Sequence, residues 1–192
     1  MAMLLPTDAS SSSLATSLVQ CVQIGNPCYH SVHVVNFDID EGHCLEWSMP
    51  TSALTEAEAN TLAMAAMPDS QPASGGLGDI SFAFRFMREG TTSTPLWGFS
   101  FFRARRVADS RRGVFQKSLV VLTHLPLFSL FRSVVALLAE AYFGPGSVDE
   151  LRDALAQLDG WSTPLALGST ALPPLLGQTL TVRCVACEPG PT

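Results

Sequence analysis

This chain has 192 residues, and its five cysteines are the residues whose chemistry is easiest to recognise. Cys184 and Cys187 are separated by two residues, which is the spacing of a redox pair or of half a zinc site. A structural zinc site needs four ligands, and no second close pair follows in the few residues that remain. Cys21, Cys28 and His30 could supply ligands only through a long-range contact. We therefore expect neither a metal site nor thiol catalysis.

A glycine-rich stretch at residues 75–78 has the composition of a phosphate-binding loop but not its context. It precedes an expected strand instead of opening a helix, and it lacks the Lys-Ser/Thr pair that would hold phosphate and magnesium. We interpret it as a connecting loop. His33 and His124 lie in apolar stretches, so we interpret both as core or edge residues. We expect no catalytic triad and no cofactor.

Positive charge is concentrated in the middle of the chain. Residues 80–132 contain nine basic and two acidic residues, whereas the whole chain has 11 basic and 17 acidic residues and a net charge of −6. A basic edge on an acidic protein can steer an acidic partner, or can meet a lipid surface in a peripheral membrane association. Nucleic acid is not favoured as a partner, because no aromatic RNA-binding signature or zinc finger accompanies the charge.

Seven polar residues around one connection are our candidates for binding a partner. They are Arg103, Arg105, Arg106, Arg111, Arg112, Gln116 and Lys117. Loops that join strands run over the surface, so we expect the guanidinium groups of residues 105–112 to be solvated. Two alternatives remain open. The arginines can be surface charges without a partner, and the two residues after them can simply satisfy carbonyl groups or coat a sheet edge.

The composition allows one domain with a substantial core. The hydrophobic fraction is 47%, the charged fraction is 15% and the mean hydropathy is +0.26. Residues 118–143 form the one apolar stretch long enough to consider as a membrane span, but His124, Pro126 and Arg132 interrupt it, and we expect no span. Residues 1–18 contain no Lys or Arg and no export signal. With an odd, scattered set of cysteines, this indicates a reducing, cytoplasmic setting.

Alternating apolar residues predict five strands, at residues 31–39, 44–49, 79–88, 96–105 and 114–125. The first two should form a hairpin around the turn residues 40–43. The last strand has apolar residues at both parities, so we expect it to be covered on both faces. Four side chains of the third strand share one face: Ile80, Phe82, Phe84 and Phe86. We interpret the Phe and Trp side chains of the third and fourth strands as core.

Three helices are expected between and after these strands. Thr55 and Glu58 have the spacing of a capping box at the start of the first helix. Apolar residues at spacings of three and four predict a long helix that begins with Pro126 in its first turn and ends at residue 143. Ser147 caps a third helix, and Trp161 lies just beyond its end.

The element order β-β-α-β-β-β-α-α predicts an α+β fold. Two hairpin-like groups joined by a crossover helix would form a five-stranded, mainly antiparallel sheet with helices on both faces, which is the longin architecture. We expect residues 1–30 to be a disordered lead-in and residues 31–161 to form the domain. Residues 162–192 are expected to be a linker rich in Pro and Leu, with one short terminal strand at residues 179–185.

Several of these segments are similar to a known family. Residues 34–40, 78–86 and 97–103 resemble the N-terminal region of DENN-domain proteins. Residues 112–120 are more specific, and together with Leu125-Pro126 and Leu130-Phe131 they resemble the sixth DENN-domain-containing subfamily and its Avl-type relatives. Residues 159–161 and 172–177 fit the stretch that follows the N-terminal module of that family. The resemblance covers residues 31–185.

The resemblance implies a function in vesicle traffic. DENN-domain proteins are guanine nucleotide exchange factors for Rab GTPases, and their N-terminal uDENN module has a longin-like fold. That module packs beside a central DENN lobe, and the GTPase docks across both. Exchange needs no covalent chemistry, because a surface that holds the switch segments of the GTPase displaced weakens nucleotide binding. The resemblance therefore implies a protein without covalent catalysis, located in the cytoplasm and recruited to endosomal or other vesicle membranes.

The chain ends at Thr192, before the central lobe of the family is expected to begin. We therefore expect either a fragment or a truncated member of the family, incomplete for exchange on its own. The alternative is a free-standing longin-type scaffold that binds trafficking proteins without exchange activity. DENN-lobe sequence directly downstream in the gene would separate the two hypotheses.

Overall fold

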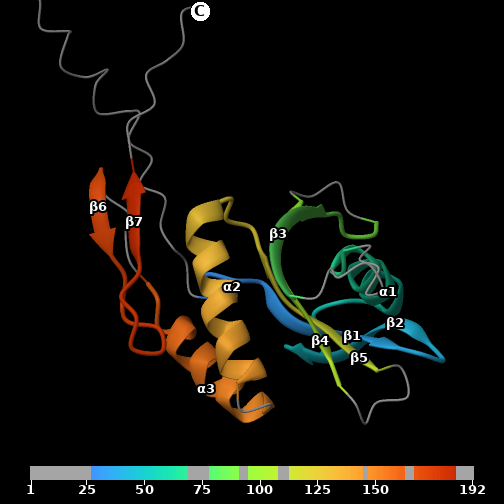
Figure 1. Cartoon of the computed structure of the whole chain (residues 1–192). Coiled ribbons are helices and arrows are strands. Elements are labelled where there is room, and N and C mark those ends of the chain that lie inside the picture. The colour runs from blue at the N-terminus through green and yellow to red at the C-terminus, as the bar shows by residue number, and fades with distance from the viewer. Residues whose placement is uncertain are drawn as a thin grey trace, which may run out of the picture.

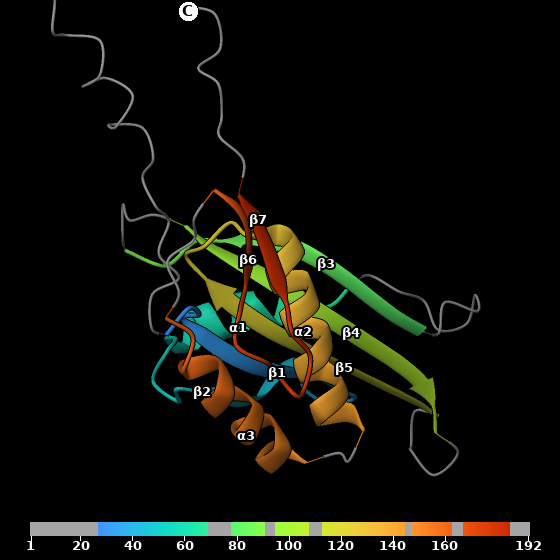
Figure 2. The same cartoon turned by 90° about the vertical axis from the view of Figure 1, so that its left-hand side faces the viewer.

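A computed structural model describes residues 27–68, 78–90, 95–107, 113–144, 147–162 and 167–184, and it describes Cys184 for its backbone alone. The elements in chain order are β1 (Ser31–Asp38), β2 (Gly42–Met49), α1 (Glu56–Ala65), β3 (Gly78–Phe86), β4 (Leu96–Arg106), β5 (Val114–Thr123), α2 (Phe128–Phe143), α3 (Val148–Asp159), β6 (Gly168–Ala171) and β7 (Thr181–Cys184). The main sheet has the order β2-β1-β5-β4-β3, and all neighbouring strands are antiparallel. Helix α1 covers one face, and α2 with α3 covers the other (Figures 1 and 2). The predicted α+β, longin-like fold is confirmed.

The central strand β5 is buried on both faces, as its sequence predicts. Leu119 and Val121 face α2 and α3, whereas Val120 and Leu122 face α1, and none of the four is exposed to solvent. A strand in the middle of a two-sided sheet needs apolar residues at both parities, which explains why its sequence does not alternate. The sheet therefore separates two hydrophobic cores.

Helix α1 is held at both of its ends by hydrogen bonds. At its start, the Thr55 hydroxyl accepts from the Glu58 backbone N–H and the Glu58 carboxylate accepts from the Thr55 N–H, so the predicted capping box is present. At its end, the hydroxyl groups of Ser100 and Ser118 both donate to the Ala66 carbonyl, at 2.8 Å each. Small side chains at this point let the C-terminal end of the helix lie against β4 and β5.

Helices α2 and α3 form the second cover of the sheet. Helix α2 begins at Phe128, two residues after the expected first turn at Pro126, and Leu127 occupies its N-cap without a side-chain hydrogen bond. Ser147 caps α3 by accepting from the Asp149 N–H, as predicted. Trp161 is fully buried beyond α3, and its indole N–H has no hydrogen-bond partner in the part of the chain that the structure describes. None of the described helices is long and apolar enough to cross a membrane.

The predicted core of β3 is only partly correct. Of the four side chains expected there, Phe86 is buried, whereas Phe82 and Phe84 are half-buried and Ile80 is 40% exposed. Strand β3 is an edge strand with β4 on one side, so its aromatic side chains have fewer neighbours than those of a central strand. On β4 the expectation is met for Phe99 and Phe101, which are buried, whereas Trp97 is half-buried.

The two ends of the domain differ from the expected boundaries. Cys28 and Tyr29, placed in the lead-in, are buried, and the Tyr29 hydroxyl donates to the Asp159 carboxylate at 2.8 Å. The expected linker contains β6, which pairs with β7, and Leu172 and Leu175 belong to the same hydrophobic cluster as residues of α2 and α3. Strand β6 has the sequence Gly-Ser-Thr-Ala, which carries no apolar alternation to predict it. Residues 1–26 lie outside the described part of the chain.

Candidate functional site

Pairing of β4 with β5 gathers five of the seven candidate residues at one end of the sheet. The register places Arg103 opposite Lys117, and Arg105 opposite Phe115. Alternate residues of a strand face opposite sides. Arg103, Arg105 and Lys117 therefore belong to the face covered by α2. We call this end, residues 103–106 and 114–117, the distal β4–β5 surface.

The other candidates divide between the opposite face and the undescribed residues. Arg106 and Gln116 belong to the face covered by α1, where Gln116 is buried and Arg106 is exposed. Arg111 and Arg112 lie outside the residues that the structure describes. Arg105 is exposed like Arg106, so these two guanidinium groups are solvated, as the sequence predicts.

Arg103 is held in a network of ion pairs within the domain. Its guanidinium donates to both carboxylate oxygens of Asp79 at 2.7 Å and to Glu140 Oε1 at 2.6 Å, and it lies over the rings of Phe101 and Phe143. The residue is only 4% exposed. Hydrogen bonding to Asp79 raises the pKa of Arg103, and the same contact holds the pKa of the Asp79 carboxyl below its usual value. Arg103 therefore fastens the C-terminal end of α2 to β3 and β4.

Lys117 is held in a second network on the same face. Its Nζ lies 2.6 Å from the Glu46 carboxylate and 3.2 Å from the Tyr142 hydroxyl, which itself donates to Glu46 at 3.2 Å. Burial opposes the charge of Lys117, but the hydrogen bonds to Glu46 and Tyr142 outweigh burial, so its pKa is raised. This contact links β2, β5 and α2. It orders the distal β4–β5 surface but leaves Arg105 and Arg106 as its exposed cations.

Sequence reasoning missed the partners of both networks, and one signal for Arg103 was available. Arg103 has the same parity on β4 as Phe99 and Phe101, both of which were assigned to the core. That parity indicates an inward side chain that needs a carboxylate partner. No comparable signal identifies Glu46, because it lies on another strand and is 71 residues from Lys117 in sequence.

Comparison with known proteins shows the family. Residues 29–158 match the family model described as "Transport protein Avl9". The chain is 32% identical over 188 residues to Protein DENND6A of Mus musculus, which covers 85% of this chain and 30% of that protein. It is also 32% identical over 179 residues to Protein DENND6B of Homo sapiens, covering 79% of this chain and 29% of that protein.

A third relative has nearly the same identity. The Protein DENND6 homolog of Dictyostelium discoideum is 31% identical over 156 residues, which covers 79% of this chain and 21% of that protein. The chain thus spans less than a third of the length of these curated relatives. The family match includes every strand of the main sheet and nearly all of the three helices. The chain belongs to the Avl9 family of transport proteins and is a DENN-domain protein related to DENND6.

Proposed function

We propose that this chain is the N-terminal longin (uDENN) module of a guanine nucleotide exchange factor for a Rab GTPase, acting on endosomal or other vesicle membranes. The observation that carries the proposal is the family match at residues 29–158, which coincides with the longin-like sheet and its helices. The module has no covalent step to perform. It contributes a surface that favours the displaced state of the GTPase switch segments, and this preference weakens nucleotide binding.

We assign the first contact with the GTPase to the exposed arginines of the distal β4–β5 surface. Arg105 and Arg106 are solvated, and Arg111 and Arg112 follow them in sequence, so together they would attract an acidic face over a distance of several ångströms. Arg103 and Lys117 have a supporting role in this proposal, since their networks hold the strands beneath these arginines in place.

We further propose that the chain alone is a weak or inactive exchange factor. In the family the GTPase docks across the N-terminal module and the central lobe, and this chain spans less than a third of its relatives. Release of a labelled nucleotide from a panel of Rab proteins would be measured with the chain alone. It would also be measured with a chimera in which the chain replaces the matching stretch of a full-length DENND6 protein.

In the chimera, the double variant Arg105→Glu/Arg106→Glu should slow association with the GTPase and make its rate less dependent on salt. Arg152→Glu on α3 is the matched control, because Arg152 is an exposed arginine whose one ion pair in the described part of the chain is with Asp149. Unchanged association of the double variant would remove these arginines from the docking surface. Robust release by the chain alone would contradict its incompleteness, and binding without release by the chimera would favour the scaffold hypothesis.

A further inference from the structure

Strand β3 is a long, regular and open edge of the main sheet. It pairs with β4 at all nine of its residues without a register shift, and no described strand pairs with its other side. The opposite edge, β2, is interrupted by a register shift in its pairing with β1. Natural proteins usually shorten, interrupt or cover such edges, because unpaired backbone groups invite another strand. Strand β3 therefore keeps the capacity to pair with one further strand.

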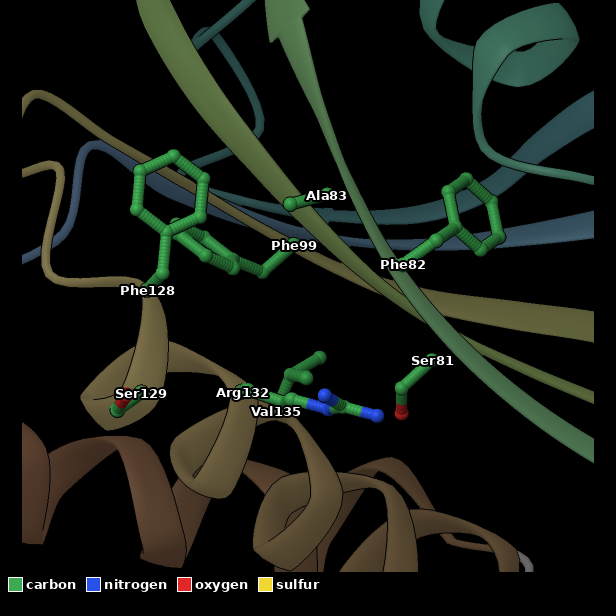
Figure 3. A pocket seen from close by; sticks show the side chains of 8 residues that line it. All are labelled: Ser81, Phe82, Ala83, Phe99, Phe128, Ser129, Arg132 and Val135. Atoms are coloured by element: carbon green, nitrogen blue, oxygen red, sulfur yellow. The ribbon is translucent and has the colours of Figure 1, made fainter.

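A cavity of about 200 Å³ lies beside this edge, between β3 and α2. Phe99, Phe128 and Val135 form its apolar wall, and the small side chains of Ser81 and Ala83 leave the space open on the β3 side. Figure 3 shows the two Phe rings close together on one side of the opening. Phe128 is 46% exposed, although it begins a core helix. The cavity is large enough to admit one apolar side chain and opens to solvent.

Two cations lie on this face without a carboxylate partner among the described residues. Figure 3 shows the Arg132 guanidinium pointing across the cavity toward Ser81, and Arg132 forms no ion pair with any described residue. Arg85 stacks over the Trp97 ring at 5.8 Å and has no ion-pair partner among the described residues either.

The acidic side chains of the same elements do not neutralise these cations. The one carboxylate of β3, Asp79, and the one carboxylate of α2, Glu140, both bind Arg103. The groove between β3 and α2 is therefore apolar in the middle and basic at its rim. Its charge complements an acidic occupant and not another basic one.

We propose that this groove binds an extended acidic segment of a partner protein, which adds an antiparallel or parallel strand to β3. Side chains on one face of a strand are spaced by about 6.7 Å. An apolar side chain of the added strand would enter the cavity beside Ala83. Acidic side chains two residues before and after it would then reach Arg85 and Arg132. Backbone hydrogen bonds supply the affinity in such strand addition, and the alternate side chains supply the specificity. The proposal does not depend on exchange of nucleotide by a Rab protein.

The first test uses the full 192-residue chain and a blocked seven-residue peptide in which glutamate, leucine and glutamate alternate with threonine. Calorimetric titration should detect binding of this peptide and none of the version with lysine in place of glutamate. Arg132→Glu and Ala83→Trp should each weaken binding at least tenfold, by reversing the rim charge and by filling the cavity. Arg152→Glu on α3 should leave it unchanged. Because both Arg132 and Ala83 are exposed, circular dichroism should show both variants folded.

The second test asks whether the peptide binds as a strand. An added strand uses the N–H groups of alternate residues only, since the others point away from the sheet. Two peptides would therefore be N-methylated on one or the other alternate set, and one should lose binding while the other keeps it. Equal loss or equal retention would overturn strand addition. Absence of binding by the parent peptide, or full binding by Arg132→Glu and Ala83→Trp, would overturn the proposal as a whole.

Discussion

His33 shows how burial decides the chemistry of a single side chain. The residue is fully buried on β1, with Nδ1 2.7 Å from the Ser48 hydroxyl and Nε2 2.8 Å from the Ser31 hydroxyl. Burial lowers the pKa of His33 to about 3, and the nearby His30 ring acts in the same direction. Two hydroxyl partners satisfy the neutral ring, so the core interpretation drawn from its apolar surroundings holds.

This environment predicts a loss of stability in mild acid. In the unfolded chain the ring takes up a proton near pH 6.5, whereas in the folded chain it does so only near pH 3. Between these values the unfolded state binds more protons. The free energy of unfolding should therefore decrease as the pH is lowered, by up to about 1.4 kcal/mol per pH unit from this residue alone.

Urea unfolding between pH 7 and pH 4 would measure this slope. The His33→Gln variant should show a shallower slope than the natural chain, while His124→Gln, which changes an exposed ring, should keep most of it. An NMR titration in which the His33 ring protonates near pH 6.5 in the folded chain would contradict the explanation.

Arg103 carries the second prediction at the residue scale. Arg103→Met removes three charge-assisted hydrogen bonds but keeps an apolar stem, so we expect a loss of about 2 kcal/mol in the free energy of unfolding at pH 7. Arg105→Met, on the same face and exposed, should change it by less than about 0.5 kcal/mol.

The pH dependence separates this ion pair from simple packing. The pKa of Asp79 is depressed by Arg103, so its contribution is present above the ordinary carboxyl pKa and is lost as pH falls through the depressed value. Arg103→Met should lack this part of the acid sensitivity. If the variant and the natural chain are equally stable at pH 7, the network does not fasten α2 to the sheet.

At the scale of elements, Glu58 joins the start of α1 to the end of β3. Its carboxylate is 2% exposed and accepts hydrogen bonds from Thr55, from the Glu89 N–H and from the Arg88 guanidinium. Glu58→Ala should cost about 2–4 kcal/mol, because it removes a helix cap and the buried carboxylate that accepts these hydrogen bonds. Glu56→Ala changes an exposed residue in the same first turn of α1 and should cost less than about 0.5 kcal/mol. Thermal unfolding of the two variants gives the comparison, and equal melting temperatures would refute this role.

The pairing of β3 with β4 gives a prediction about two residues at once. Gly98 lies opposite Phe84, whose ring covers the glycine so closely that an added Cβ would fall within 3 Å of three ring atoms. Gly98→Ala should therefore destabilise the sheet by about 1–2 kcal/mol, the range of mild overpacking. Phe84→Leu in the same chain should recover part of that loss. Strictly additive effects in the double-mutant cycle would show that the ring does not constrain this position.

The elements were largely predictable because each has a periodicity or a cap of its own. The capping box of α1, the Ser147 cap of α3 and the two-sided apolar run of β5 all follow from local sequence. Strand β6 and the exposure of Ile80 do not, since pairing with β7 and the position of β3 at the sheet edge depend on distant parts of the chain. The same limit explains why solvated Arg105 was anticipated but the buried partners of Arg103 were not.

For the whole molecule, the sheet divides the hydrophobic core into two parts of unequal depth. Leu130 of α2 is 6% exposed and lies in the larger part, whereas Phe84 of β3 is half-buried beside α1. Both positions were expected to behave as core. The structure predicts a difference instead: Leu130→Ala should cost about 2–4 kcal/mol.

Phe84→Ala should cost less, about 1–2 kcal/mol, because its ring already contacts water and leaves a smaller cavity when removed. Urea unfolding followed by circular dichroism measures both values under the same conditions. A larger loss for Phe84→Ala would mean that the α1 side carries more of the stability than burial indicates.

Trp161 gives this molecule an internal optical reporter. Its indole is fully buried just beyond the end of α3 and donates no hydrogen bond within the described residues, whereas Trp47 and Trp97 are partly exposed. An indole in dry, apolar surroundings fluoresces at shorter wavelength than one in water. When tryptophan is excited selectively, the emission spectrum of the folded chain should therefore contain a component at short wavelength. Trp161→Phe should remove that component. Because Tyr29 is tied to Asp159 just before this residue, loosening of the N-terminal segment would become visible as a red shift.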